Sequence, residues 1–218
     1  MKGLFVTFEG TEGCGKSTQI ELLAKTLRVL GYRVRELREP GGTPIGEEIR
    51  HTLKHSKANV AMTPETELLL MNASRAQLVR ETIRPALTAG EIVLSDRFYD
   101  STTAYQGHGR GLDLSLVKSV IDFAVGDTRP DLTLLLHVPP EISAERLLSR
   151  QSTLPFVVRD RFEEGDRNFF ARVAKGYEAI AAAEPNRVRV LDGAGAIEVV
   201  CARIWEQVQP ALPRVGRW

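Results

Sequence analysis

The sequence predicts an α/β fold in which helices cover both faces of a five-stranded parallel sheet. Two observations predict this class. Short apolar runs alternate along the chain with longer segments of helical pattern, as in strands joined by crossover helices. Several of the short runs are almost continuously apolar, which is typical of strands buried on both faces. The expected strands cover residues 3–8, 33–38, 92–95, 132–138 and 188–191.

Helical segments fill the intervals between these strands. The first expected helix begins in a glycine-rich loop and ends near residue 30, before Gly31. A long helix is expected over residues 64–87, with Thr63 as its N-cap and a kink at Pro85. The other expected helices cover residues 45–54, 114–125, 141–150, 167–183 and 197–208.

Length and charge limit the domain count and the class of partner. The chain has 218 residues, so we expect one domain over residues 1–212 and a short tail at 213–218. Lys and Arg number 29 against 28 Asp and Glu, so no bulk positive field would attract nucleic acid or an anionic membrane. No apolar run approaches the roughly 20 residues of a membrane span.

The cysteines and histidines indicate neither a disulfide framework nor a metal cluster. Cys14 and Cys201 are the two cysteines, and they lack the C-x-x-C spacing of a zinc site. The four histidines form no local group. A cytoplasmic, reducing location is therefore expected.

The stretch FEGTEGCGKST, residues 8–18, predicts a phosphate-binding loop. Residues 10–17 fit the pattern G-x-x-x-x-G-K-[ST] between a strand and a helix. Its glycines let successive backbone N–H groups curl around an anion, and the positive end of the following helix points to the same place. The expected ATP-binding residues are Gly10, Thr11, Glu12, Gly13, Cys14, Gly15, Lys16, Ser17 and Thr18.

Within this loop, Lys16 would place a charge beside the β- and γ-phosphates, and Ser17 would offer a hydroxyl ligand to Mg²⁺. Cys14 lies near a helix N-terminus, where a thiolate is favoured, but we interpret it as a small side chain that is tolerated there. GTPases, ATPases, synthetases and nucleotide kinases all use such a loop. The sequence lacks the guanine-reading pattern N-K-x-D, which counts against a GTPase.

A second polar group follows the third expected strand, in EIVLSDRFYDST at residues 91–102. Ligands of parallel sheets bind outside the carboxyl ends of the strands. Asp96 would then hold Mg²⁺ directly or through water, and Arg97 would offer its planar fork to a second phosphate. The alternative is a surface Asp–Arg pair that caps the strand.

Three further segments carry polar groups toward the same edge of the sheet. REPGGT at residues 38–43 leads into a helix that bears Arg50. Met71 and Arg75 are four residues apart and share a helix face, where Arg75 either extends to water or donates to a base carbonyl. The stretch YQGHGRG at residues 105–111 is read as a functional loop.

A closing lid is expected over residues 150–163. Arg150, Arg159 and Arg161 flank a stretch without helical pattern, so arginines would reach a phosphate site when the segment closes. A solvated charged loop is the alternative.

Taken together, the motifs resemble those of bacterial thymidylate kinases over residues 3–192. FEGTEGCGKST, REPGGT, SRAQ, DRFYDSTTAYQG, GRG and RPDLTLLL occur in this order, and the second and fourth are far more specific than the glycine loop. The resemblance implies the P-loop fold of nucleoside monophosphate kinases and a homodimer. It also implies transfer of the γ-phosphoryl group of ATP to dTMP with Mg²⁺, giving ADP and dTDP for dTTP synthesis.

The resemblance implies roles for individual residues. Arg97 would clamp the dTMP phosphate with help from Arg50, Arg75 would read thymine, and Tyr105 would crowd out a 2′-hydroxyl. The implied dTMP-binding residues are Glu12, Arg50, Met71, Arg75, Arg97, Ser101, Tyr105 and Gln106. The implied catalytic residues are Lys16, Arg97, Glu9, Arg150, Arg159 and Arg161, and the implied metal ligands are Ser17, Asp96 and Glu9.

One position marks a subdivision of the family, and two others depart from the common family pattern. Cys14 stands where some members carry a loop arginine, which together with the arginines near residue 150 resembles the bacterial lid-arginine type. Met71 replaces a phenylalanine that stacks on thymine, and His137 replaces an aspartate. The rival hypotheses are a kinase for another monophosphate, a P-loop protein that binds ATP without an acceptor, and a nucleic-acid-binding ATPase.

Overall fold

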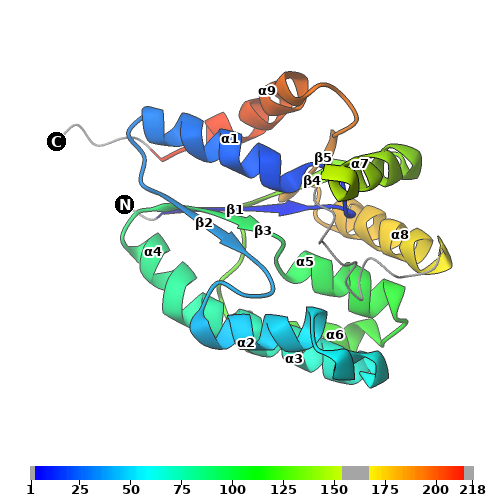
Figure 1. The fold of residues 1–218 in the computed structure, drawn as a ribbon. Coiled ribbons are helices and arrows are strands. Elements are labelled where there is room, and N and C mark those ends of the chain that lie inside the picture. The colour runs from blue at the N-terminus through cyan, green and yellow to red at the C-terminus, as the bar shows by residue number, and fades with distance from the viewer. Residues whose placement is uncertain (1–2, 154–166, 214–218) are drawn as a thin grey trace.

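The computed structural model, which describes residues 3–153 and 167–213, contains the predicted five-stranded parallel sheet (Figure 1). The strand order is β2-β3-β1-β4-β5, and every neighbouring pair is parallel. The strands are β1 (Leu4–Glu9), β2 (Val34–Arg38), β3 (Ile92–Asp96), β4 (Leu132–His137) and β5 (Val188–Asp192). Each lies within a residue or two of its expected position, so the predicted strands are confirmed.

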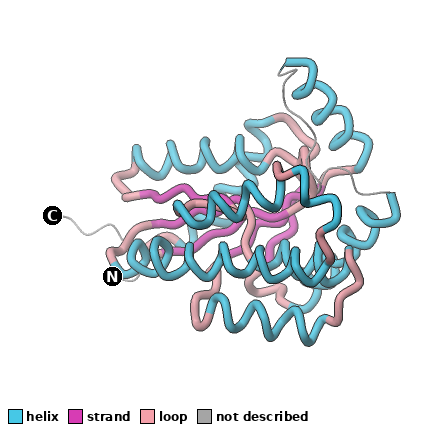
Figure 2. Tube along the Cα trace, turned by 60° about the horizontal axis from the view of Figure 1, so that its bottom comes forward, coloured by secondary structure: helices cyan, strands magenta, loops and turns pink. Residues whose placement is uncertain are grey.

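Helices enclose the sheet on both faces, as Figure 2 shows with the strands in the middle. Helices α1 and α9 lie on one side, and α2 to α6 lie on the other (Figure 1). The helices are α1 (Lys16–Val29), α2 (Pro44–Lys54), α3 (Pro64–Leu78), α4 (Arg84–Thr88), α5 (Tyr99–Thr102), α6 (Leu114–Val125), α7 (Pro140–Thr153), α8 (Arg167–Ala183) and α9 (Ile197–Val208). Within the described ranges, no helix combines the length and hydropathy needed to cross a membrane.

The central strand β1 separates two hydrophobic cores. Val6 and Phe8 pack into the core beneath α1 and α9, whereas Phe5, the residue before Val6, packs into the core beneath α3 and α6. All three side chains are fully buried. Because successive side chains of a strand point to opposite faces, an almost continuous apolar run is what a two-sided core requires. Burial of each such side chain stabilises the fold by about 1.5–3 kcal/mol.

Helices α2 and α3 begin with the signals that sequence rules predict. Thr63 caps α3, since its Oγ1 accepts a hydrogen bond from Thr66 N at 3.3 Å. Thr43 caps α2 in the same way, accepting from Gly46 N at 3.0 Å. Each cap satisfies one backbone N–H that has no partner in the first helical turn. The prediction for Thr63 is confirmed.

The helix predicted over residues 64–87 is divided by a π-helical segment. Residues Val79–Ile83 form the wider turn between α3 and α4. Pro85 lacks an N–H, and its ring clashes with the carbonyl four residues earlier in a regular helix. The widened turn just before Pro85 is the kind of local change that accommodates this clash.

The stretch predicted as a loop at residues 105–111 is largely helical, which corrects that prediction. After α5, residues Thr103–Gly109 form a second π-helical segment. Glycines lower helix propensity, and the sequence rules therefore disfavoured a helix here. At Gly109 the glycine serves packing, because a Cβ there would lie 2.7 Å from the Phe169 ring of α8.

The expected lid begins inside a helix. Helix α7 continues to Thr153, so the backbone of residues 150–153 is helical and not the irregular segment that we expected. The remainder of the lid, with Arg159 and Arg161, lies outside the described residues.

The Thr63 cap gives a stability prediction. Thr63→Ala removes the acceptor for Thr66 N, so the free energy of unfolding should fall by about 1 kcal/mol in urea titrations. Thr26→Ala, the same substitution at an exposed position inside α1, is the control and should change it by less than about 0.5 kcal/mol. Equal stabilities of Thr63→Ala and the wild-type protein would contradict the capping role.

Candidate active site

The predicted phosphate loop joins the end of β1 to the start of α1. Gly10, Gly13 and Gly15 have φ angles of 133°, 75° and 98°, in the region that side chains rarely adopt. A Cβ on Gly10 would lie 2.5 Å from the carbonyl oxygen of Leu136, and one on Gly13 would lie 2.7 Å from that of Ser143. The loop therefore needs glycine both for its backbone angles and for its close packing against β4 and α7.

Lys16 curls back over the loop. Its Nζ donates to the carbonyl oxygens of Gly10 at 3.2 Å and Thr11 at 3.0 Å, and Cys14 Sγ lies 3.5 Å away. Burial and Arg97 act to lower the pKa of Lys16, but nearby acidic groups outweigh them and leave this pKa above its ordinary value. Cys14 is buried in the core under α1, which fits the small tolerated side chain better than an exposed thiolate.

Ser17 and Asp96 meet at the carboxyl end of the sheet, as predicted. Ser17 Oγ donates to Asp96 Oδ2 at 2.8 Å. A hydroxyl and a carboxylate are the hard oxygen ligands that Mg²⁺ prefers, and the ion commonly keeps several waters. No cluster of three or more acidic, histidine or cysteine ligands exists in the described part of the chain. The oxygen donors of Ser17 and Asp96 fit this preference.

Arg97 donates hydrogen bonds to five groups of the site. It has a φ of 72°, a strained angle for a residue with a side chain. Its Nη1 donates to Gly10 O at 3.0 Å, and its Nη2 donates to Glu12 Oε1 at 2.7 Å. The guanidinium also lies 5.1 Å from the centre of the Tyr105 ring. Arg97 is only 13% exposed and pairs with Glu12, so the alternative of a surface pair with Asp96 is wrong.

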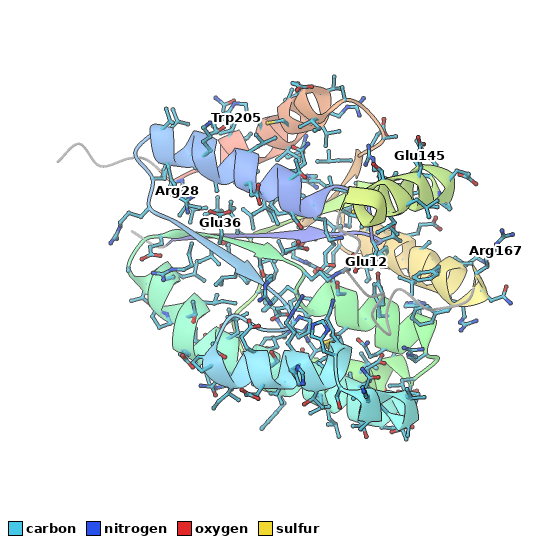
Figure 3. All side chains as sticks on the ribbon, viewed as in Figure 1. Glu12, Arg28, Glu36, Glu145, Arg167 and Trp205 are labelled. Carbon is cyan, nitrogen blue, oxygen red and sulfur yellow. The ribbon has the colours of Figure 1, made fainter. Side chains whose placement is uncertain are left out.

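The Arg97–Glu12 pair stays ionised over the physiological pH range. Burial would raise the pKa of Glu12, but Arg97, then Lys16 and Lys54, hold it well below its usual value. Burial would lower the pKa of Arg97, but Tyr105 and Glu12 outweigh it and keep it well above the ordinary value. Glu12 lies beyond the end of β1, at the carboxyl edge of the sheet (Figure 3). This end of the site therefore carries fixed charges of both signs.

Glu9 is placed differently from the expectation of a metal ligand. Its carboxylate is fully buried and accepts hydrogen bonds from Phe98 N at 2.8 Å, Ser101 Oγ at 2.5 Å and Tyr177 OH at 2.9 Å. Burial first, and then Asp100, raises the pKa of Glu9 above its ordinary value. Both oxygens already have protein donors, so the geometry favours a positioning role over direct contact with a metal.

A pocket opens between the phosphate loop and helices α2, α3 and α5. Its lining includes seven of the eight residues expected to hold the acceptor: Glu12, Met71, Arg75, Arg97, Ser101, Tyr105 and Gln106. Four further lining residues were missed: Glu39, Pro40, Lys54 and Thr102.

The missed residues have signals that could have been used. Glu39 and Pro40 belong to the REPGGT turn, and Lys54 is four residues after Arg50 on α2. Arg50 itself does not line the pocket; its Nη1 donates to Pro40 O at 2.8 Å. Arg50 thus stabilises the REPGGT turn, which forms part of the pocket wall.

Arg75 lines the pocket, but its guanidinium is fully engaged by the protein. Nε and Nη2 contact Glu39 Oε2 at 2.8 and 2.6 Å. Nη1 donates to Asn72 Oδ1 at 3.0 Å and to Thr102 Oγ1 at 2.9 Å, and Nη2 also donates to Phe98 O at 3.2 Å. The side chain is 1% exposed, so the suggestion that it extends to water is wrong. Each guanidinium nitrogen holds pocket residues in place.

Glu39 keeps one buried oxygen without a partner. Oε2 binds Arg75, whereas Oε1 has no hydrogen bond. Burial raises the pKa of Glu39 to about 7, against the lowering effect of Arg75. A buried polar atom beside a pocket without a partner is costly and is commonly satisfied by a ligand or water.

Arg146 is a contact of the phosphate loop that the sequence reading missed. It lies on α7, one turn before Arg150, and its Nη2 donates to Gly193 O at 3.1 Å. Its Nη1 lies 3.5 Å from Cys14 O. His137 is exposed at the end of β4, so it does not fill space in the core.

Fold and site together define a P-loop nucleotide-binding protein with an acceptor pocket beside the loop. The family model described as Thymidylate kinase matches residues 8–204. Two bacterial relatives, both thymidylate kinases, match nearly the whole chain. The one from Geobacter sp. (strain M21) is 45% identical over 215 residues, covering 99% of this chain and 95% of the relative. The one from Syntrophotalea carbinolica is 47% identical over 212 residues, covering 97% and 98%.

A solved structure agrees with this assignment. The crystal structure of thymidylate kinase from Ehrlichia chaffeensis matches with a TM-score of 0.75 and 33% sequence identity, covering 96% of this chain and 99% of that one. The chain therefore belongs to the thymidylate kinase family. The resemblance inferred from its motifs is confirmed.

Glu39 gives a prediction for the pH dependence of stability. Its pKa is about 4.5 in the unfolded chain and about 7 in the fold, so the folded state binds the extra proton between these values. The free energy of unfolding should therefore fall as pH rises through this window. Position 39 does not titrate in Glu39→Gln. Relative to this variant, the free energy of unfolding of the wild-type protein should fall by roughly 3 kcal/mol at most as the pH rises through the window.

Urea titrations of both proteins between pH 5 and 8 measure this difference. Glu47→Gln is the control. Burial alone would raise the pKa of Glu47, but the Gly42 N–H and Arg38 lower it below its ordinary value. The difference in free energy of unfolding between Glu47→Gln and the wild-type protein should therefore not change with pH in this range. A pH-independent difference for Glu39→Gln would show that Glu39 titrates normally.

Proposed function

We propose that the protein transfers the γ-phosphoryl group of ATP to dTMP, giving ADP and dTDP for dTTP synthesis. The observation that carries this proposal is the position of the pocket. It lies against Arg97 and Glu12 of the phosphate site and extends to Met71 and Gln106. An acceptor held there would present its phosphate to the donor bound by the loop. Membership of the thymidylate kinase family supports dTMP as that acceptor.

On the donor side, the residues of the loop at 10–18 would hold the phosphates of ATP through backbone N–H groups and Lys16. Lys16 now bonds to loop carbonyls, so binding exchanges these contacts for phosphate oxygens. Ser17 and Asp96 would hold Mg²⁺ directly or through water. When bound, Mg²⁺ supplies positive charge that neutralises the phosphate oxygens.

The acceptor needs no strong general base, because its phosphate oxygen is already anionic at neutral pH. This oxygen forms a bond to the γ-phosphorus while the bond from that phosphorus to the bridging β-oxygen breaks, and ADP leaves. Arg97, which now binds Glu12, would hold the acceptor phosphate in line by exchanging Glu12 for phosphate oxygens. The protein's contribution is positioning and charge neutralisation.

On the nucleoside side, the buried rings and polar groups suit a deoxynucleotide. Tyr105 would lie beside the deoxyribose and leave no room for a 2′-hydroxyl. Met71 would cover one face of the base with its polarisable thioether. Gln106 would contact the base edge, and Arg75 would position Glu39 and Thr102 around it. Arg150, Arg159 and Arg161 remain predicted lid residues for the transferred group.

A homodimer is supported by exposed apolar side chains on adjoining helices. Phe123 and Leu116 lie on one face of α6 and are 84% and 52% exposed, and Leu69 on the neighbouring α3 is 58% exposed. Large apolar residues gathered on a surface commonly mark an interface between proteins. We propose that this face pairs two copies, and that the enzyme works in the cytoplasm, where ATP is present.

The substrate proposal is tested by coupled ADP release with a panel of monophosphates. We expect dTMP to give the highest kcat/KM among dTMP, AMP, GMP and CMP. Equal or faster turnover of one of the others would identify a different monophosphate kinase. Tight ATP binding without turnover of any monophosphate would instead support an ATP-binding protein.

The assigned roles of Lys16 and Arg97 are tested by substitution. Lys16→Ala and Arg97→Ala should each lower kcat/KM by at least about 100-fold, since each removes a charge that stabilises the transition state. Arg35→Ala, which breaks an exposed ion pair with Glu91, is the matched control and should retain turnover. Near-normal activity of Lys16→Ala or Arg97→Ala would mean that the site is misplaced.

A further inference from the structure

Gln106 lines the pocket, yet its amide group is held in one orientation. Its Nε2 donates to Glu67 Oε1 at 2.8 Å. Both side chains are buried, Gln106 being 1% exposed and Glu67 fully buried. A half-turn of the amide would place its oxygen against the carboxylate oxygen, and two acceptors facing each other without water are strongly unfavourable. The contact therefore selects one orientation of the amide.

Glu67 is in turn fixed as an acceptor by Arg110. Arg110 Nε donates to Glu67 Oε1 at 3.1 Å, and its Nη2 donates to Oε2 at 3.0 Å. The guanidinium lies 4.6 Å from the centre of the Phe169 ring, which keeps its plane in place. An ionised carboxylate has no hydrogen to donate, so it can face only the NH₂ side of the Gln106 amide.

As a consequence, the amide oxygen of Gln106 faces the pocket as a hydrogen-bond acceptor. Gln106 lines the pocket and Glu67 does not, so Nε2 is directed out of the pocket and Oε1 is the amide atom left for a ligand. Among the residues that the structure describes, none donates a hydrogen bond to Gln106 Oε1. The atom is thus available to a donor on the bound base.

An acceptor at this place distinguishes two kinds of pyrimidine. Thymine and uracil are imides, whose N3 carries a hydrogen between two carbonyl groups. Cytosine has an unprotonated N3 and an amino group at C4, so its N3 lone pair would face the Gln106 oxygen. A buried mismatch of this kind leaves both acceptors unsatisfied and rejects the wrong ligand strongly.

We infer that Glu67, held by Arg110, is a positioning residue that turns the Gln106 oxygen toward the base and so makes the pocket select an imide nucleobase over an aminopyrimidine. This inference rests on the proposed dTMP acceptor and deepens it. It concerns the N3 and C4 positions alone. dUMP carries the same imide as dTMP, so Glu67 does not distinguish these two.

The test compares dTMP with 5-methyl-dCMP, which has the same sugar, phosphate and methyl group and differs at N3 and C4. In Glu67→Gln the new amide can donate as well as accept, so Gln106 can turn its NH₂ group toward the base. The ratio of kcat/KM for dTMP over 5-methyl-dCMP should fall at least about tenfold from its wild-type value. The loss for dTMP should appear mainly in KM, and the ratio of dTMP to dUMP should not change.

A second variant and a control separate orientation from general damage. Glu67→Gln leaves Arg110 without its anion, so Glu67→Gln/Arg110→Met removes the unpaired buried charge and should show the same fall in selectivity. Asp100→Asn is the control, because it breaks the buried contact of Asp100 Oδ2 with Arg187 Nη1 at 2.7 Å, at the start of the same helical segment. It should affect both substrates alike and leave their ratio unchanged.

Each outcome decides a separate question. A wild-type selectivity ratio in folded Glu67→Gln and in the double variant would overturn the positioning role. A fall in the ratio with Asp100→Asn as large as with Glu67→Gln would also overturn it, since loosening of the helix would then suffice. Failure of the wild-type protein to phosphorylate dTMP would instead refute the proposed function, on which the inference rests.

Discussion

The buried carboxylate of Glu9 is the contact on which the rest of the site depends. It ends the central strand β1 and accepts hydrogen bonds from Phe98 N, Ser101 Oγ and Tyr177 OH. These donors come from the segment after β3 and from α8, so one side chain joins three parts of the chain. Such a buried group is costly unless its oxygens are satisfied, which fixes the geometry of every donor around it.

Arg97 owes its position to this junction. The residue directly before Phe98 adopts a strained positive φ, and strain of this kind persists only where surrounding contacts determine the backbone. Its N–H donates to Phe8 O at 2.9 Å, which continues the pairing of β3 with β1. The guanidinium then meets Glu12 and Tyr105 at the mouth of the pocket. The contacts that hold this strained backbone therefore also fix the position of a cation that would hold phosphate.

Several polar groups of the pocket are held by hydrogen bonds to other residues of the protein. Arg75 binds Glu39 and Thr102, and Glu67 binds Gln106. Groups fixed in this way lose little further freedom when a nucleotide binds, so more of the contact energy is available for binding and alignment. Glu39 Oε1 is the exception, since it is buried without a partner.

The sequence by itself determined the sheet, the glycine loop and the Asp96–Arg97 pair at the carboxyl edge. These features are local: strand burial follows from apolar runs, and phosphate loops need glycine at fixed spacing. Only the tertiary structure decided that the Arg75 guanidinium binds Glu39 and that the Gln106 amide donates to Glu67. These contacts join separate helices and turns, and which donor meets which acceptor depends on packing in three dimensions, because spacing along the chain does not specify partners across the core.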